Sequence, residues 1–249
     1  MKNLCILCAI LIAFCLAGVP NMYAADEYVT DDEVKVNDQG YIMSWLFLDP
    51  FIEDNIGSDL AAGKDYFDDQ GGEANIMPRE GDVVRIGETG SEHVWTRVNF
   101  LDLVAMKELT AAVGGNELDI ARWGPRDSVN YKQEYLVAYL KWNSDTKVKF
   151  TVGVDDATEV FFNGELIVEH PSASQDWGAG NAGNKEVDVK GGEWNILVVG
   201  CYEAAGEWGI TVQVDSVPDV VNNVGPPELF AVEPLDKLTT TWGRIRETF

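Results

Sequence analysis

An Asn-Gly pair between two apolar runs is the feature that most constrains the fold of this chain. Asn163-Gly164 separates Val160-Phe161-Phe162 from Leu166-Ile167-Val168. Both central residues of a type I′ turn need a positive φ, which Asn and Gly tolerate best, so the segment predicts a β-hairpin. Every second residue from Val148 to Val154 is also apolar, which is the period of a strand with one buried face. The pair Asp155-Asp156 therefore lies where a core strand ends.

Other strand-length segments with alternating or continuous apolar residues surround this hairpin. They are residues 41–48, which Pro50 is expected to end, and residues 82–86, 93–100, 135–142, 185–190, 193–202 and 208–214. Short strands separated by turn residues, with a short helix expected at 102–113, predict an all-β fold. We expect a two-layer antiparallel β-sandwich of the jelly-roll type over residues 34–215, with a long acidic loop at 53–80.

The N-terminal residues have the pattern of a secretory signal peptide. Residues 1–25 combine Lys2, an apolar run and the small-residue cleavage site Tyr23-Ala24-Ala25. We therefore expect the protein to be secreted or placed in the cell envelope, after cleavage near Ala24 or Ala25. A lipid anchor at Cys15 is the weaker alternative, because Phe14 occupies a position where a lipoprotein signal has a small residue.

Three further segments flank the expected sandwich. Residues 26–33 are polar and acidic, and we expect a flexible lead-in there. Residues 216–228 are rich in Pro and Asn, which oppose both strand and helix, so they predict a linker. Residues 229–249 then form a C-terminal tail.

Charge and cysteine content exclude several functional classes. The chain has 42 acidic and 18 basic residues, a net charge of -24. Such a field repels nucleic acid and anionic membrane, and it favours hard cations such as calcium. A solvated acidic surface without a bound ion is the alternative. Beyond the signal only Cys201 remains, so we expect neither an intramolecular disulfide nor a thiolate metal cluster, and a buried Cys201.

Catalytic motifs are absent from the sequence. There is no Gly-x-Ser-x-Gly, no His-Glu-x-x-His and no phosphate-binding loop, and the only histidines are His93 and His170. Carboxylate pairs are frequent, but a glycosidase needs two of them across a cleft at a defined separation. We therefore expect a protein that is not an enzyme, with a glycan-processing enzyme as a distant alternative.

Several motifs resemble those of a known group of domains. Residues 153–156, 160–164 and 166–168 resemble the signature hairpin shared by PA14-type domains and the galactose-binding-like jelly rolls of secreted bacterial proteins. Residues 191–199 and 206–212 are similar to the closing strands of these domains, and residues 45–51 and 71–73 resemble their opening block. The resemblance covers about residues 40 to 215 and implies a jelly-roll sandwich.

The resemblance also implies a site. In the sugar-binding PA14 members the matching Asp pair holds a calcium ion that grips sugar hydroxyls, which implies a calcium site at Asp155 and Asp156 with Asn163 and Asp176 close in sequence. The alternative is that the two carboxylates only accept hydrogen bonds from turn amides.

Tryptophans bear on the same hypothesis, because an aromatic ring stacks on the apolar face of a sugar. Trp177 and Trp123 lie next to glycines in segments without strand periodicity, and we expect them to be exposed near the ligand. The alternative is that both fill the ends of the sandwich. Trp45, Trp142 and Trp194 lie inside expected strands and are predicted to belong to the core.

These features predict an exported, non-catalytic carbohydrate-binding or adhesion module that binds a glycan or cell-surface polysaccharide, with calcium as a candidate cofactor. We expect its site where Asp155-Asp156 meets the loop at 170–184. The alternative is a structural or assembly protein of the cell envelope or extracellular matrix.

The C-terminal tail could mediate attachment under the structural or assembly alternative. Residues 238–246 have strand-forming residues and two arginines, suited to pairing with a sheet edge or a protein partner, unless the terminus is frayed.

Overall fold

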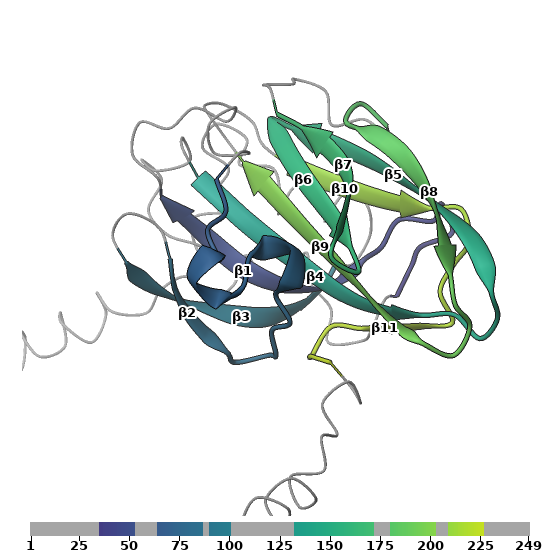
Figure 1. Cartoon of the computed structure of the whole chain (residues 1–249), viewed down its shortest axis with the longest axis horizontal. Coiled ribbons are helices and arrows are strands. Elements are labelled where there is room, and N and C mark those ends of the chain that lie inside the picture. The colour runs from purple at the N-terminus through teal and green to yellow at the C-terminus, as the bar shows by residue number, and fades with distance from the viewer. Residues whose placement is uncertain are drawn as a thin grey trace, which may run out of the picture.

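The computed structural model describes residues 35–52, 64–86, 90–100, 132–171, 180–202 and 209–226. These residues form two antiparallel sheets that pack face to face (Figure 1). The larger sheet has eight strands in the order β2-β3-β1-β4-β9-β6-β7, with β11 pairing with β4, and the smaller has the order β10-β5-β8. The predicted all-β sandwich is therefore confirmed.

The strand bounds follow the apolar segments of the sequence closely. The larger sheet contains β1 (Ser44–Ile52), β2 (Val83–Ile86), β3 (Ser91–Asn99), β4 (Lys132–Lys141), β6 (Ala157–Phe162), β7 (Glu165–His170), β9 (Trp194–Tyr202) and β11 (Val220–Asn222). The smaller sheet contains β5 (Thr146–Asp155), β8 (Gly183–Val189) and β10 (Gly209–Val214). Two short 3-10 turns, η2 (Asp68–Gln70) and η3 (Glu73–Asn75), lie between β1 and β2. The helix expected at 102–113 lies outside the described residues.

β1 continues past the proline that was expected to end it. The strand runs to Ile52, and its pairing with β4 shifts register between Leu48 and Phe51. A proline cannot donate to a sheet ladder, but it is tolerated at such an irregularity. The register shift thus explains how Pro50 lies inside the strand.

The Asn-Gly hairpin has the predicted backbone. Asn163 has φ 51° and Gly164 has φ 82°, both in the left-handed region that a type I′ turn requires. The two residues connect β6 to β7, which pair in antiparallel fashion. The hairpin prediction is confirmed at the level of single residues.

The main core lies between the two sheets. It is built from the apolar positions of β5 and β10 in the smaller sheet and of β1, β4, β6 and β9 in the larger one. Trp45 and Trp142 are buried in it as predicted, and so is Cys201. Trp194 is half-buried: it packs at the border of a second core on the outer face of the larger sheet and lies under the ammonium group of Lys141, 5.5 Å from the ring centroid.

A second core covers the outer face of the larger sheet. Phe67 and Ile76, from the segment that carries η2 and η3, pack on Trp95, Tyr135 and other outward side chains of the sheet. Figure 1 shows this segment, in dark blue, lying across β1 and β4. Residues 64–80, the described part of the acidic 53–80 loop, therefore cover the outer face of the larger sheet.

The linker prediction for residues 216–228 is wrong over residues 220–226, which are packed against the larger sheet. β11 pairs with β4, and Val221 is 1% exposed. The amide of Asn223 donates to Asn99 Oδ1 over 2.7 Å, and the N–H of Glu80 donates to the carbonyl oxygen of Val224 over 2.8 Å. Asn222 and Asn223 contributed to the linker prediction, but Asn223 supplies a tertiary hydrogen bond and Asn222 accepts from the N–H groups of Val224 and Gly225 in a local turn.

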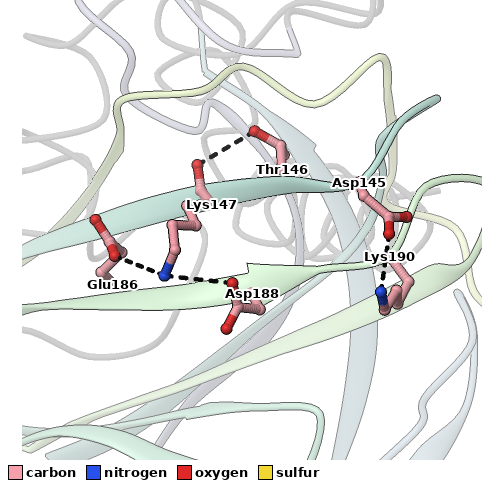
Figure 2. Close-up of polar contacts among 6 residues, drawn as sticks. All are labelled: Asp145, Thr146, Lys147, Glu186, Asp188 and Lys190. Carbon is pink, nitrogen blue, oxygen red and sulfur yellow. Dashed lines mark hydrogen bonds and ion pairs between the residues drawn. The ribbon is translucent and has the colours of Figure 1, made fainter.

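The outer face of the smaller sheet is charged. Lys147 Nζ lies 3.0 Å from Glu186 and 3.3 Å from Asp188, and Lys190 Nζ lies 2.8 Å from Asp145 (Figure 2). Exposed ion pairs of this kind contribute little to stability, because water and salt screen them. This face is a solvated surface in which these lysines are matched by carboxylates. Among the described residues no helix is long and apolar enough to cross a bilayer.

Replacing Gly164 by Val should destabilise the protein by about 1 kcal/mol or more, because a β-branched side chain resists a positive φ. Urea denaturation gives the free energy of unfolding. Glu165→Val, at the exposed first position of β7, adds the same side chain without this backbone requirement and should cost less. Equal costs would contradict the turn assignment.

Truncation should separate β11 from the tail. A mature chain ending at Pro226 should keep the cooperative unfolding transition, whereas a chain ending at Asp215 should lose about 2 kcal/mol or more through exposure of the β11 contacts. Circular dichroism during urea denaturation measures both. Equal stability of the two truncated chains would show that β11 is dispensable.

Candidate functional site

Asp155 and Asp156 lie where the chain crosses from the smaller sheet to the larger one. Asp155 is the last residue of β5, and β6 begins at Ala157. Asp155 lies opposite Gly209 at the start of β10, and Ala157 lies opposite Tyr202 at the end of β9. The two aspartates are 3% and 5% exposed, and the peptide bond between them is cis. The pair thus occupies a covered position at one end of the sandwich.

Asn181 holds another segment beside the pair. Its side-chain Oδ1 accepts a hydrogen bond from the N–H of Val154 over 2.7 Å, and its Nδ2 donates to the carbonyl oxygen of Val154 over 2.6 Å. The amide therefore replaces a strand partner next to Asp155. Because Asn181 precedes β8, this contact fixes the start of β8 at the end of the sandwich that carries the aspartates.

The loop that was expected to meet the aspartates has both of its described ends there. His170, at the end of β7, lies opposite Thr158, two residues after Asp156, and Asn181 bonds the residue before Asp155. Residues 172–179, with Asp176 and Trp177, lie outside the described residues, and so does Trp123.

A row of polar side chains crosses the larger sheet at the same end. Glu134 on β4 lies opposite Cys201 on β9, Cys201 lies opposite Thr158 on β6, and Thr158 lies opposite His170 on β7. These positions are in phase with Leu136, Val199, Val160 and Val168, which belong to the core between the sheets. The four side chains, here called the polar row, therefore face the space between the sheets.

The polar row carries several kinds of hydrogen-bonding group. Glu134 and Thr158 are fully buried, and Thr158 Oγ1 donates to the carbonyl oxygen of Gly200 over 2.6 Å. Cys201 Sγ lies 4.0 Å from the carbonyl oxygen of Asp155, which connects the row to the aspartates. His170 Nε2 is buried without a hydrogen-bond partner among the described residues. A buried polar atom in that situation is suited to meet a ligand or an ordered water.

The aspartates fit a hard cation in ligand type but not in ligand number. Calcium takes six to eight oxygen ligands, and carboxylates are its preferred donors. Within the described ranges, no three His, Cys, Asp or Glu residues are close enough together to hold a metal ion. An ion at Asp155 and Asp156 would therefore need further oxygen ligands from backbone carbonyls, other segments or a ligand.

Asn163, the other predicted site residue that the structure describes, lies away from the aspartates. It follows β6 at the opposite end, and six extended residues span about 20 Å. Its Nδ2 donates to Asn195 Oδ1 and its Oδ1 accepts from the N–H of Ile196, each over 2.9 Å. The side chain of Asn163 thus holds the hairpin against β9, and the structure does not bring it to the aspartates.

A buried carboxylate on the outer face of the larger sheet fastens the covering segment. Glu73 of η3 accepts hydrogen bonds from the hydroxyl of Tyr135, from the hydroxyl of Tyr202 over 3.2 Å and from the N–H of Tyr66 over 2.9 Å. Burial raises the pKa of Glu73 above its ordinary value, against the lowering effect of these donors. The contact joins residues far apart in the sequence.

Glu159 on β6 belongs to the same group. Its carboxylate lies 3.4 Å from the hydroxyl of Tyr202, which also contacts Glu73. Burial, followed by the charges of Glu73 and Glu169, raises the pKa of Glu159 to about 7. Because Glu73 and Glu159 share one hydroxyl in a covered site, charging both carboxylates at once costs free energy.

Sequence reasoning missed the polar row and the Glu73 group. The signal for the row was present: Glu134 and Thr158 occupy the apolar phase of their strands, where a polar residue is unexpected. Nothing local distinguishes Glu73, because its partners lie 62 and 129 residues away in the chain.

Comparison with known proteins does not identify a family. No protein-family model and no curated protein matches the chain. Among solved structures, an anti-sigma factor domain-containing protein matches with 10% identity and a TM-score of 0.35 over 46% of this chain, and the match spans only 36% of that protein. A PA14 sugar-binding domain from an RTX adhesin matches with 14% identity and a TM-score of 0.36, covering 74% of this chain and 96% of that one.

The A domain of Epithelial Adhesin 6 from Candida glabrata, solved in complex with Galb1-3GlcNAc, matches with 8% identity and a TM-score of 0.34. It covers 80% of this chain and 88% of the adhesin domain. At these TM-scores and identities, the similarities carry no argument about function.

The Glu159 carboxyl should make stability depend on pH. Its folded pKa of about 7 lies above the ordinary value of 4.5, so the folded state holds the proton more tightly. The stabilisation is fully present below about pH 4.5 and is lost as the pH rises through 7, by about 1 to 2 kcal/mol once partial solvent exposure is allowed for. Urea denaturation at pH 4.5 to 8 should show the dependence weakened in Glu159→Gln. Glu165→Gln, an equal charge change on exposed β7, should leave it unchanged.

Proposed function

We propose that this protein is an exported, non-catalytic module that binds a glycan at the end of the sandwich carrying Asp155 and Asp156. The observation that carries this proposal is the convergence there of two covered aspartates and the polar row. Carboxylate, hydroxyl and imidazole groups at one end of a sandwich suit a ligand with many hydroxyl groups.

The residues at this end have distinct roles in the proposal. Asp155 and Asp156 accept hydrogen bonds from sugar hydroxyls or hold a cation that does so. His170, with its buried Nε2, donates to or accepts from the same ligand. Asn181 keeps the start of β8 in place beside them. Trp177 and Asp176 are proposed to complete the site from the segment that connects β7 to β8.

Calcium is the proposed cofactor of this site. When bound, the ion would polarise and orient sugar hydroxyls, as the resemblance of the Asp pair to that of sugar-binding PA14 domains implies. The net charge of -24 favours a cation at covered carboxylates. Asp155 and Asp156 would hold it, together with oxygens that other segments and the ligand contribute.

A structural or assembly role in the cell envelope or extracellular matrix is the second candidate. The observation in its favour is the burial of Trp45, Trp95 and Trp142, which leaves these rings unable to stack on a sugar. Under this alternative the polar row and the aspartates only stabilise the end of the sandwich. The two candidates differ in whether a glycan binds there at all.

A glycan array run with and without calcium should select the ligand, and calorimetry should then measure its affinity. We expect a dissociation constant in the micromolar to millimolar range, or about 4 to 8 kcal/mol, because each contact at a wet site is modest. Asp156→Asn should weaken binding at least tenfold and remove the heat of calcium binding. Trp177→Ala should weaken binding without removing the calcium heat.

The matched control is Asp188→Asn, whose side chain is exposed on the outer face of the smaller sheet. It changes the net charge equally and should leave affinity unchanged. Because Asp156 is covered, His170→Gln offers a milder second variant, which should also lower the affinity. If both variants keep full affinity and calcium produces no heat, the site lies elsewhere and the envelope role takes its place.

A further inference from the structure

The described chain ends beside the edge of the larger sheet. After β11, the carbonyl oxygen of Val224 accepts a hydrogen bond from the N–H of Glu80, three residues before β2. A Cβ added to Gly225 would lie 2.9 Å from Cγ of Arg79, so the two backbones are closely apposed. Figure 1 shows the yellow end of the described chain near the segment that leads into β2. Everything after Pro226 therefore starts next to β2.

β2 presents an unpaired edge. It pairs with β3 on one side and is the last strand of its sheet, and no described strand pairs with its other side. The N–H of Trp95 donates to the carbonyl oxygen of Asp82 over 2.9 Å. In an antiparallel pair the direction of these groups alternates, so the N–H groups of Val83 and Arg85 point to the free edge. Such an edge is a template for another strand.

A pocket adjoins this edge on the outer face of the sheet. Its volume is about 260 Å³, and its lining includes Phe67, Met77, Val83 and Trp95. Met77 is 41% exposed and Val83 56%, which is high for large apolar side chains next to a buried floor. The polar side chains of Gln70, Asn75 and Asp82 also line the pocket. A cavity of about 150 Å³ holds benzene, so the space is large enough for an indole ring, whose N–H can donate to these polar groups. The edge and the pocket together form one docking surface for a strand with an aromatic side chain.

The C-terminal tail contains a segment with that chemistry. Residues 237–246 read Lys-Leu-Thr-Thr-Thr-Trp-Gly-Arg-Ile-Arg, with three basic residues and no acidic one. Thr, Trp and Ile favour strands, and Trp242 is the kind of residue that anchors interfaces. The basic residues complement a chain of net charge -24, in which Asp82 lines the pocket and Asp68 and Asp69 lie in sequence between the lining residues Phe67 and Gln70.

We propose that residues 238–246 of the same chain add a strand to the free edge of β2 and place Trp242 in the pocket beside Met77. Eleven residues separate Pro226 from Leu238. An extended chain of that length spans about 35 Å, so the tail reaches an edge that lies next to its starting point. The short connection gives the tail a high effective concentration at its own β2, which favours docking within one chain over docking between copies. This inference concerns a different face from the proposed glycan site and does not depend on it.

Hydrogen exchange on the mature full chain, followed by NMR, tests the proposal. The amides of Val83 and Arg85 should exchange at least tenfold more slowly in the wild type than in Trp242→Ala. Trp242→Phe, which keeps an aromatic anchor, should retain most of this protection. The amide of Val84, which faces β3, should exchange equally in all variants and serves as an internal control.

Met77→Lys supplies a test from the side of the docking surface. The side chain of Met77 is exposed enough to be replaced without unfolding the cover, and an ammonium group at the rim should repel the basic tail and release it as Trp242→Ala does. Sedimentation velocity should show a monomer at all concentrations. Equal exchange in the wild type and Trp242→Ala would overturn the proposal. Protection that appears only as dimers form would also overturn it, because the tail would then dock on a second copy.

Discussion

The burial of both faces of the larger sheet is the constraint on which the rest of this structure depends. Along β4, Leu136 and Leu140 face the smaller sheet, whereas Tyr135 and Tyr139 face the segment that carries η2 and η3. A strand buried on both sides has a nearly continuous apolar sequence, which β4 has. The covering segment must then bring partners for the buried hydroxyls: Glu73 accepts from Tyr135 and Tyr202, and the carbonyl oxygen of Pro78 accepts from Tyr139. The outer cover is therefore part of the domain.

The same constraint explains where a ligand could bind. With one face of the larger sheet packed on the smaller sheet and the other covered, the described core is closed over much of its area. The ends of the sandwich are where polar side chains replace apolar ones in the inward phase, as Thr158 does at the start of β6. Asp155 and Asp156 lie at that end because the chain changes sheets there. The crossing from β5 to β6 therefore determines where the proposed site lies.

Local sequence patterns predicted the elements but not the long-range contacts. The alternation in β5 and the Asn163-Gly164 turn follow from backbone preferences of a few residues, so both were predictable. β11 was not predictable, because the residue that follows it, Asn223, is held by a tertiary hydrogen bond to Asn99 that the local sequence does not indicate. The polar row depends on the register of four strands, which no single segment specifies. Asn163 was placed with the aspartates by its nearness in sequence, whereas a strand of six residues separates them.

An NMR titration with the glycan that binds best, in the presence of calcium, would locate the binding site. The largest amide shift changes should fall on residues 154–158 and at His170, Asn181 and Gly209, which surround the sheet crossing. Amides of the Asn163-Gly164 turn, at the far end of β6, should stay unchanged. Shift changes centred on that turn, or on the covered outer face around Glu73, would show that the glycan does not bind at the sheet crossing.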